Sequence, residues 1–299
     1  MTDNATIKDK IYIEPNVNPD IFGRLQKISV ERDKEKRRGV PILSAKNVSK
    51  KFGDHLVIPN LNFSIEDIEG KSEIISVLGT SGSGKSTILK LIAGLIQPTT
   101  GEMFLMENKI EGPGMDRGMI FQKYSSFPFL NVIDNIAYPL IKIKKIKKNV
   151  AREEAKHWVD KMYLTGAEYK YPHQLSGGMQ QRVAIARTLC MKTKIILMDE
   201  PFGALDRKIR WEMQDLMVEL LFLNPEQEVT VFLVTHDIPE AIFLGDRVWI
   251  IHKGDILLDE YVERPSEPAR LTQGRRDFLD MVAYFSEKID NLEIKGKKC

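Results

Sequence analysis

The segment that most constrains the fold is a glycine-rich loop between an apolar run and a helical pattern. The loop reads GTSGSGKS, Gly79 to Ser86, and it fits the pattern G-x-x-x-x-G-K-[ST] at every fixed position. It directly follows the apolar run EIISVL and opens the helical pattern STILKLIAGL. This context predicts a strand, a phosphate-binding loop and a helix in that order, whereas a chance glycine-rich turn would not need these neighbours.

Each part of this loop has a chemical use in holding a nucleotide. Glycines let backbone N–H groups face inward and surround phosphate oxygens. Lys85 can reach the β- and γ-phosphates, and the Ser86 hydroxyl can bind Mg²⁺. The predicted nucleotide-binding residues of the loop are Gly79, Thr80, Ser81, Gly82, Ser83, Gly84, Lys85, Ser86 and Thr87.

A second apolar run ends in two adjacent carboxylates. The segment KIILMDEP, Lys194 to Pro201, predicts a strand that delivers Asp199 and Glu200 to its carboxyl end, where open α/β sheets place their ligands. Asp199 is expected to hold Mg²⁺, directly or through water, and Glu200 to polarise the attacking water. Without the phosphate loop, the same residues would indicate only an acidic strand end.

The wider pattern of apolar runs predicts an α/β fold. The segments EIISVLG, KIILMD and TVFLVTH are typical of strands buried on both faces of a parallel sheet, with helical stretches between them. ILSAKNVSKKF and HLVIPNLNFSI alternate like strands of a small antiparallel sheet. We expect a charged N-terminal extension over 1–40, a main domain over 41–262 with a helical subdomain over about 124–192, and a tail over 263–299 with a short amphipathic helix.

Composition limits where such a chain works. A net charge of +2 over 299 residues argues against a protein that works mainly by coating nucleic acid. Cys190 falls in an apolar helix pattern and Cys299 is the last residue, so the cysteines form no disulfide framework and fit a reducing compartment. The start MTDNATIKDK lacks the apolar core of a signal peptide, and no apolar run approaches the roughly 18 residues of a membrane span. We therefore expect a cytosolic protein that can serve a membrane as a peripheral partner.

A third motif, LSGGMQQRVAIARTL from Leu175 to Leu189, resembles half of an anion site. Ser176 can cap a helix, and Gly177 and Gly178 leave the backbone bare around the first turn. A helix start with free N–H groups and a serine hydroxyl suits phosphate, yet this one has no lysine. The alternative is an ordinary helix cap.

The order of these motifs resembles the ABC ATPase family. A phosphate loop, a helical region and L-S-G-G-[MQ] closely before an Asp-Glu strand follow one another as in that family. The resemblance implies a P-loop ABC-type fold with a RecA-like parallel-sheet core, an N-terminal antiparallel β subdomain and a helical insertion. It also implies an aromatic that stacks on adenine, a glutamine that links the γ-phosphate to the helical subdomain, an aspartate after the acidic pair and a γ-phosphate histidine. The residues in these positions are Phe52, Gln122, Asp206 and His236.

The resemblance also gives the third motif a use. In the family, two ATPase units bind head to tail, and each supplies its serine–glycine loop to the ATP held by the other. The residues expected to act in trans are therefore Ser176, Gly177, Gly178 and Asp206. The expected catalytic residues are Glu200, His236 and Gln122, and the expected Mg²⁺ ligands are Ser86, Gln122 and Asp199.

Two further features favour one branch of the family. The stretch from Gly79 to Ser176 has no sustained heptads, unlike repair and chromosome members with long coiled coils, and the chain carries one ATPase unit rather than two. GPGMDRGMIFQ followed by FPFLNVIDNIAYPL looks most like the nitrate, sulfonate and taurine importer group. This resemblance implies an importer's ATP-hydrolysing subunit at the cytoplasmic face of the cell membrane. Its partners would be a second ATPase subunit (the same chain or a close paralogue), two membrane-spanning permease subunits and a solute-binding protein, without nucleic acid. The alternative is a soluble ABC ATPase acting on nucleic acid or ribosomes.

The segment SSFPFLNVIDN, Ser125 to Asn135, begins three residues after Gln122. It places Phe127, Phe129 and Leu130 around Pro128, a residue that interrupts regular structure. These apolar side chains either fill the base of the helical subdomain, or at least one of them lines an exposed groove that receives a helix of the membrane subunit.

Overall fold

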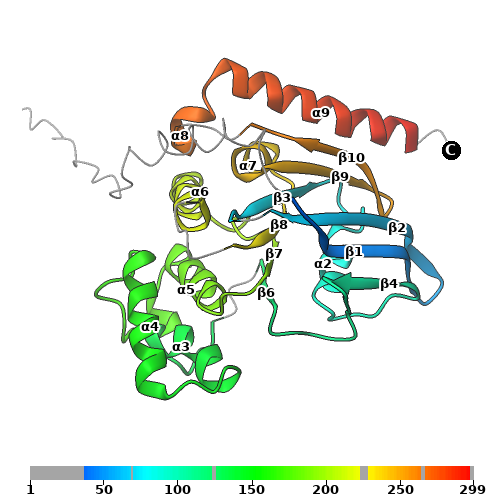
Figure 1. The fold of residues 1–299 in the computed structure, drawn as a ribbon. Helices are drawn as coiled ribbons and strands as arrows, with labels where there is room; N and C mark the ends of the chain where they lie inside the picture. The colour runs from blue at the N-terminus through cyan, green and yellow to red at the C-terminus, as the bar shows by residue number, and fades with distance from the viewer. Residues whose placement is uncertain (1–36, 69, 123–125, 223–227, 264–266, 297–299) are drawn as a thin grey trace, which may run out of the picture.

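A computed structural model describes residues 37–68, 70–122, 126–222, 228–263 and 267–296, with side chains between residues 40 and 291. Most of the expected N-terminal extension, residues 1–36, lies outside the described residues, and so does Ser125. The strands form a four-stranded sheet of order β2-β1-β4-β5 and a six-stranded sheet of order β10-β9-β3-β8-β7-β6 (Figure 1). The four-stranded sheet consists of β1 (Arg37–Phe52), β2 (His55–Ile68), β4 (Thr100–Leu105) and β5 (Asn108–Lys109). The six-stranded sheet consists of β3 (Glu73–Leu78), β6 (Arg117–Ile120), β7 (Ile195–Asp199), β8 (Thr230–Val234), β9 (Arg247–His252) and β10 (Asp255–Tyr261).

The six-stranded sheet is parallel except at one edge. β3 pairs in parallel with β8 and β9, and β7 pairs in parallel with β6 and β8, whereas β10 is antiparallel to β9. Every residue of β3 and β8 is buried, as expected for strands covered on both faces. The apolar runs predicted as parallel strands are these strands and β7, and the alternating N-terminal segments form the antiparallel pair β1 and β2, so the predicted α/β class is confirmed.

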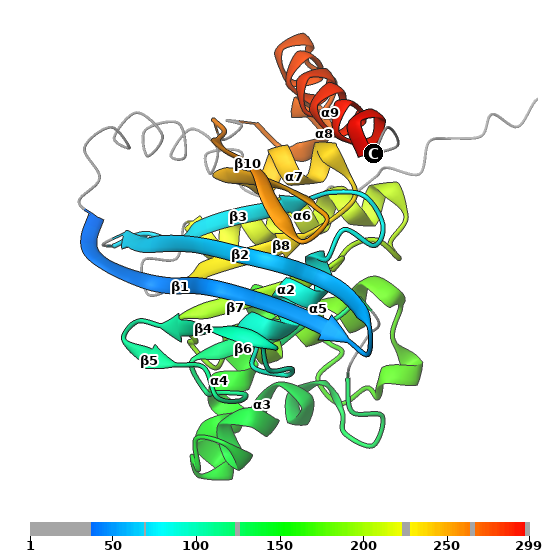
Figure 2. The ribbon, with the colours of Figure 1, turned by 90° about the vertical axis from the view of Figure 1, so that its right-hand side faces the viewer.

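The helices divide between the two faces of the parallel sheet. α2 (Lys85–Ile92) shares one hydrophobic cluster with strands of both sheets, through side chains that include Ile58, Ile88 and Phe232. A second cluster contains the other sheet face and the helices that lie between β6 and β9 in the chain. These helices are α3 (Val132–Lys142), α4 (Lys148–Lys161), α5 (Gly177–Leu189), α6 (Arg207–Phe222) and α7 (Ile238–Leu244). In Figure 2, the long strands β1 and β2 cross in front of this layered core.

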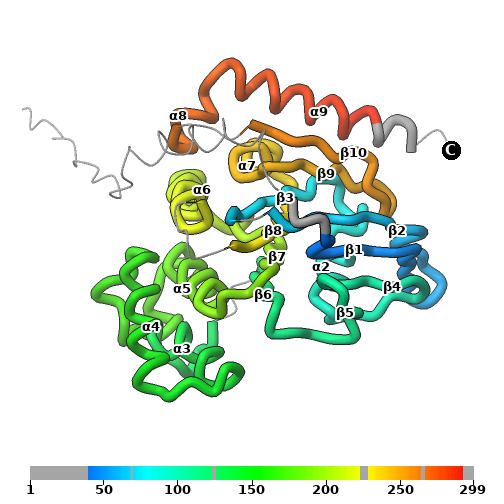
Figure 3. The backbone as a smooth tube through the Cα atoms, viewed as in Figure 1, coloured from blue at the N-terminus to red at the C-terminus, as the bar shows by residue number. Residues whose placement is uncertain are grey.

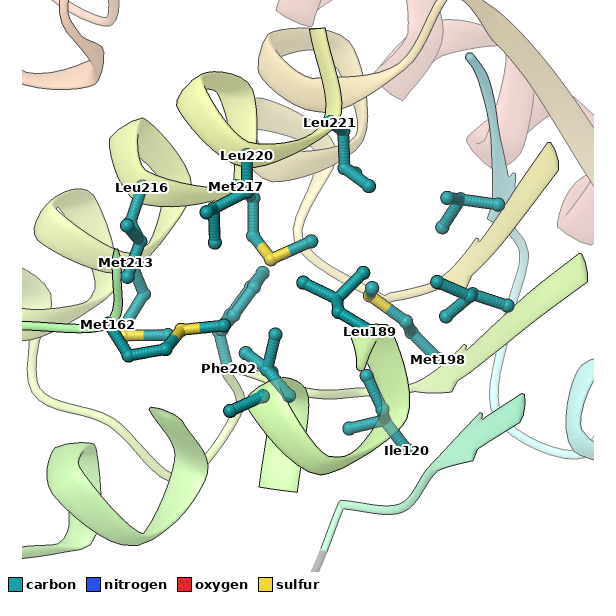
Figure 4. Close-up of a cluster of buried hydrophobic side chains, with 14 of the residues drawn as sticks. Ile120, Met162, Leu189, Met198, Phe202, Met213, Leu216, Met217, Leu220 and Leu221 are labelled. Atoms are coloured by element: carbon teal, nitrogen blue, oxygen red, sulfur yellow. The ribbon is translucent and has the colours of Figure 1, made fainter. Parts of the chain in front are cut away.

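The helical subdomain is joined to the sheet by continuous packing. Figure 4 shows Ile120 of β6 and Met198 of β7 in one cluster with Leu189 of α5 and a row of methionine and leucine side chains from α6. Phe202 lies in this cluster with an exposed fraction of 0%, two residues after Glu200. Since this phenylalanine is fully buried, it anchors the loop that follows β7.

The C-terminal tail packs on the main domain. After the short helix α8 (Ala269–Thr272), α9 (Arg276–Gly296) runs as a 21-residue helix beside α7 and β10 (Figure 3). Phe278 and Phe285 are buried in the main cluster, with Met281 and Val282 beside it, which is the helical spacing visible in the sequence. The hydroxyl of Tyr284 donates to the carboxylate of Glu260 at 2.8 and 3.0 Å, so the helix is also fixed to β10 by polar contacts.

Candidate nucleotide-binding and catalytic site

Glycines shape the loop between β3 and α2 where other residues would not fit. Gly79 has φ of 149°, and a Cβ there would lie 2.3 Å from the carbonyl oxygen of Ile251. Gly84 precedes the first turn of α2 with φ of 103° and provides no side-chain cap. The N–H groups of this turn therefore remain available to an anionic ligand, as at other helix starts that bind phosphate.

A turn that is distant in the sequence supports the loop and itself lies against β2. The N–H of Gly254, in the turn between β9 and β10, donates to the carbonyl of Ser83 at 2.8 Å. Gly254 itself approaches β2 so closely that a Cβ would lie 2.3 Å from the carbonyl oxygen of Val57. Sequence reasoning missed this residue; the turn-like KGD between two strand patterns is its only local signal.

Lys85 is held inside the loop by the loop's own carbonyls. Its Nζ donates to the carbonyls of Gly79 at 2.7 Å and Thr80 at 2.8 Å. Burial lowers the pKa of Lys85 from its ordinary value, while the nearby carboxylates of Glu200 and Asp199 act in the opposite direction. The ammonium is thus a preformed cation beneath the loop, where the β- and γ-phosphates of a nucleotide are expected.

The other residues of the loop occupy different environments. Ser83 is buried, and its hydroxyl has no hydrogen-bond partner within the described residues, which leaves a polar atom for a ligand. Ser81 and Gly82 are exposed at the tip of the loop, and Thr87 is half-buried in the first turn of α2.

A hydroxyl and a carboxylate meet at the end of β7. The Oγ of Ser86 donates to Oδ1 of Asp199 at 2.9 Å. Burial raises the pKa of Asp199, and the hydrogen bond from Ser86 partly offsets this effect. No cluster of three or more His, Cys, Asp or Glu side chains suited to a metal was found in the described part of the chain. The pair nevertheless fits Mg²⁺, which proteins commonly bind through one or two side chains together with substrate phosphates.

The other two predicted catalytic residues, Gln122 and His236, lie beside one carboxylate oxygen of Glu200. Nε2 of Gln122 donates to Oε2 of Glu200 at 3.1 Å, and Nδ1 of His236 lies 3.3 Å from the same oxygen. The side chain of Glu200 is 27% exposed and that of His236 is 67% exposed, so the cluster opens to solvent. Three segments that are far apart in sequence therefore converge on one carboxylate.

The backbone of Glu200 is held in an unusual conformation. Its φ is 48°, in the left-handed region that residues other than glycine seldom adopt. The N–H of Glu200 donates to the carbonyl of Val234 at 2.9 Å, and the buried Phe202 fixes the chain on the other side. Strain of this kind, about 1–3 kcal/mol, persists where the surroundings impose it, commonly at functional sites.

Phe52 lies at the end of β1 and is 48% exposed. The Nζ of Lys50 is 5.1 Å from the ring centroid. An exposed aromatic face with a neighbouring cation can accept a planar base, whereas a core phenylalanine would be covered.

The third motif forms the start of α5 and makes a different kind of helix terminus. Ser176 is exposed, and its Oγ accepts a hydrogen bond from the N–H of Met179 at 3.3 Å. A Cβ on Gly178 would lie 2.8 Å from Cγ2 of Ile209, so only a glycine lets α5 approach the start of α6 this closely. Asp206 caps α6 by accepting from the N–H groups of Lys208 and Ile209, both at 3.1 Å. The predicted trans-acting residues therefore lie on two adjoining helix starts.

The aromatic residues after Gln122 have unequal environments. Phe129 is 68% exposed. Phe127 is half-buried, and its ring centroid lies 4.6 Å from that of Tyr138 and 5.0 Å from the guanidinium of Arg187. A hollow of about 490 Å³ lies beside these three side chains. Each alternative for this segment therefore fits a different residue. Phe127 contributes to the packing of the helical subdomain, whereas Phe129 is exposed and available to a partner.

Comparisons with known proteins cover most of this architecture. Residues 59–203 match the family model described as ABC transporter. The chain is 36% identical over 249 residues to the nitrate transport protein NasD of Klebsiella oxytoca, covering 79% of this chain and 92% of that protein. It is 42% identical over 207 residues to the aliphatic sulfonates import ATP-binding protein SsuB of Bacillus cereus, covering 69% of this chain and 78% of that protein. A solved dimeric ATP-binding cassette bound to ADP and Pi has a TM-score of 0.63 and 34% identity, covering 74% of this chain and 98% of that one.

Proposed function

The chain belongs to the ABC transporter family, as its motif order predicts, and from this premise we propose that it is the ATP-hydrolysing subunit of a membrane importer. The observation that supports this proposal most is the convergence of Lys85, Ser86, Asp199 and Glu200 behind one phosphate loop. The naming of relatives for nitrate and sulfonate import favours this function over a soluble ATPase that acts on nucleic acid or ribosomes.

ATP is the substrate of the proposed reaction. The bare first turn of α2 and the ammonium of Lys85 bind its phosphates, and the exposed ring of Phe52 stacks on its adenine. The contacts from Gly254 and Ile251 keep the loop in this shape before ATP arrives. Preformed binding groups cost little reorganisation at the moment of reaction.

Mg²⁺ would be held by Ser86 and Asp199, with Gln122 reaching the same edge of the sheet. When bound, it would supply positive charge to the phosphate oxygens as negative charge develops on them. Glu200 orients and polarises the attacking water. His236, beside Glu200, contacts the γ-phosphate and holds this carboxylate in position.

A second ATPase subunit completes each site. Ser176 uses its oxygen as an acceptor within α5, which leaves the hydroxyl hydrogen free to donate to a γ-phosphate. The exposed start of α5 and the neighbouring Asp206 supply these contacts to the ATP of the partner. Closure of the dimer then depends on the γ-phosphate, and hydrolysis of ATP allows the dimer to open again.

The remaining partners are two membrane-spanning permease subunits and a solute-binding protein. Within the described ranges, no helix has the length and apolar character that crossing a membrane requires. We place the chain at the cytoplasmic face of the cell membrane, with Phe129 inserted into the permease contact. The solute is a small anion of the nitrate, sulfonate or taurine type.

The test has two parts. Purified full-length protein should release phosphate from Mg-ATP, and affinity purification from detergent-solubilised membranes should recover a multi-span protein. Uptake assays in a deletion strain, run over nitrate, sulfonates and taurine, then identify the solute. Recovery of ribosomes or nucleic acid in place of a multi-span protein would replace the importer with the soluble alternative.

A further inference from the structure

One arginine bridges the two loops that the proposed function assigns to different ATP molecules. Arg210 lies in the first turn of α6, and its Nη1 donates to Oδ2 of Asp237 at 2.7 Å. Its Nη2 donates to the carbonyl of Leu205 at 3.2 Å. Leu205 directly precedes Asp206, and Asp237 directly follows His236. A single guanidinium therefore joins the loop after β7 to the loop after β8.

Both ends of this bridge are fixed to rigid elements. Oδ1 of Asp237 accepts from the N–H of Glu240 at 3.1 Å and so caps α7, while Oδ2 is the atom that meets Arg210. On the other side, Asp206 caps α6, the helix that carries Arg210. α6 and α7 also contact each other and lie side by side in Figure 1. A displacement of one loop is therefore passed to the other through short, direct contacts.

We infer that Arg210 is a positioning residue that couples the two ATP sites of the dimer. This inference rests on the proposed function, in which His236 contacts the γ-phosphate of the chain's own ATP and Asp206 reaches the ATP of the partner. Through Arg210, the position of His236 sets the position of Asp206. The γ-phosphate of one ATP thereby affects the alignment of the other site.

The fork of the guanidinium matters more than its charge. Both side chains keep contact with water, with 27% of the Arg210 side chain and 25% of the Asp237 side chain accessible, so a charge that loses its partner can still be hydrated. A lysine would keep the charge, but its ammonium cannot reproduce the planar fork that contacts a carboxylate and a carbonyl together. Loss of the bridge should consequently change the alignment of His236 with Asp206 without unfolding the protein.

The experiment measures ATP hydrolysis by the full-length protein against ATP concentration, together with binding of a fluorescent ATP analogue. The wild type should have a Hill coefficient above 1. Arg210→Met should lower kcat about 10- to 100-fold, as expected for small misplacement of catalytic groups. It should bring the Hill coefficient to about 1 and change the dissociation constant of the analogue less than about twofold. Arg210→Lys should behave like Arg210→Met.

Asp237→Asn breaks the same bridge from the other end. An asparagine can keep the cap of α7 through its amide oxygen, but its NH2 cannot accept from Arg210. Asp237→Asn should reproduce the Arg210→Met kinetics, and the double variant should be no worse than either single one. The matched control is Arg152→Met, which removes another Arg–Asp pair, that with Asp134 in the helical subdomain, and should keep wild-type kinetics.

Several results would overturn the inference. They are a wild-type Hill coefficient of 1, wild-type kinetics in Arg210→Met, and losses that multiply in the double variant. A large drop in melting temperature in both Arg210→Met and Asp237→Asn would assign the bridge to stability alone. Absence of ATP hydrolysis in the wild type would instead contradict the proposed function, so the two failures are distinguishable.

Discussion

Two helix starts in this molecule have the glycine-rich backbone of an anion site, and they differ in almost every other respect. α2 begins behind Gly84 without a side-chain cap, and the adjacent Lys85 is buried against its own loop. α5 begins at Ser176, which is exposed, caps its own helix and has no lysine beside it. We therefore expect the first to bind phosphate alone and the second to complete a site that already holds phosphate.

The surroundings of the two helix starts differ in the same way. The phosphate loop is supported by the turn containing Gly254 and faces the paired side chains of Ser86 and Asp199. The start of α5 adjoins the start of α6, where Gly178 packs against Ile209. Preorganisation on one side and exposure on the other are what a site shared between two subunits requires.

The largest expected effect follows from removing the cation of the first helix start. Lys85→Ala deletes the only side chain of the loop that supplies positive charge, and loss of such an electrostatic group typically costs about 10²–10³ in turnover. ATP affinity should fall as well, so this variant combines a loss of turnover with a loss of binding. Phosphate release and binding of a fluorescent ATP analogue measure the two effects. Lys90→Ala, on the exposed side of the same helix, is the control, and an unchanged Kd with normal turnover in Lys85→Ala would refute the phosphate-loop assignment.

The next effect separates chemistry from binding at the same site. Glu200→Gln removes the carboxylate proposed to polarise water, a contribution worth about 10²–10⁴ in rate, or about 3–5 kcal/mol of barrier. The amide keeps the shape of the side chain, so ATP should still bind and should trap the closed dimer. Size-exclusion chromatography with Mg-ATP detects that dimer. A monomer profile together with wild-type turnover would remove Glu200 from its proposed role.

A smaller effect concerns the helical subdomain that carries the second helix start. Phe129→Glu should leave folding and ATP binding intact, because the side chain is 68% exposed, yet it should weaken membrane association and stop uptake. Aromatic anchors at protein interfaces commonly contribute about 2 kcal/mol or more. Tyr169→Glu, at a residue 69% exposed in the same subdomain, is the matched control for the added charge. A steep drop in melting temperature would place Phe129 in the core, and normal uptake would remove the docking surface.

The smallest expected effect concerns the stability that the protein loses by burying one carboxyl group in α7. Burial raises the pKa of Glu240 to about 7, and Gln214 donates to its carboxylate at 3.3 Å. Between about pH 4.5 and 7 the folded protein keeps this proton and the unfolded chain loses it, so stability falls as pH rises through that window.

Glu240→Gln should therefore be more stable than the wild type at pH 8, by at most about 3 kcal/mol, and similar to it near pH 4.5. Urea denaturation at both pH values gives the two differences, with the exposed Glu107→Gln as control. Equal stabilities of Glu240→Gln and wild type at pH 8 would mean that the carboxyl ionises without penalty.

Local sequence was sufficient for the parts of the site that depend on neighbouring residues. GTSGSGKS requires its strand and helix for steric and electrostatic reasons, so the place of Lys85 between a strand and a helix could be predicted. The carboxylates at the end of β7 followed from the apolar run before them. Contacts between distant segments could not be predicted in this way. Nothing near Arg210 indicates that Asp237 lies beside it, and the support from Gly254 depends on how β9 pairs with β3 and β10 pairs with β9.

The alternatives for the segment after Gln122 illustrate the same limit. Phe127 and Phe129 are two residues apart, and the positions of Tyr138 on α3 and Arg187 on α5 decide which ring is covered. The tail is similar: the apolar spacing of Phe278 and Phe285 predicts a helix, but the surface that buries it belongs to α7 and the main cluster.

The central claim is that the two helix starts act on one ATP from opposite subunits, and mixed dimers test it directly. With Lys85→Ala and Ser176→Arg on the same chain and a wild-type partner, each of the two sites loses one half, and no active site should remain. With the two changes on opposite chains, both defects fall in one site, and the other should stay whole. Single-turnover counting of active sites should thus give none per dimer in the first case and one in the second. The reverse result, one and none, would mean that each subunit encloses its own ATP and would contradict the account.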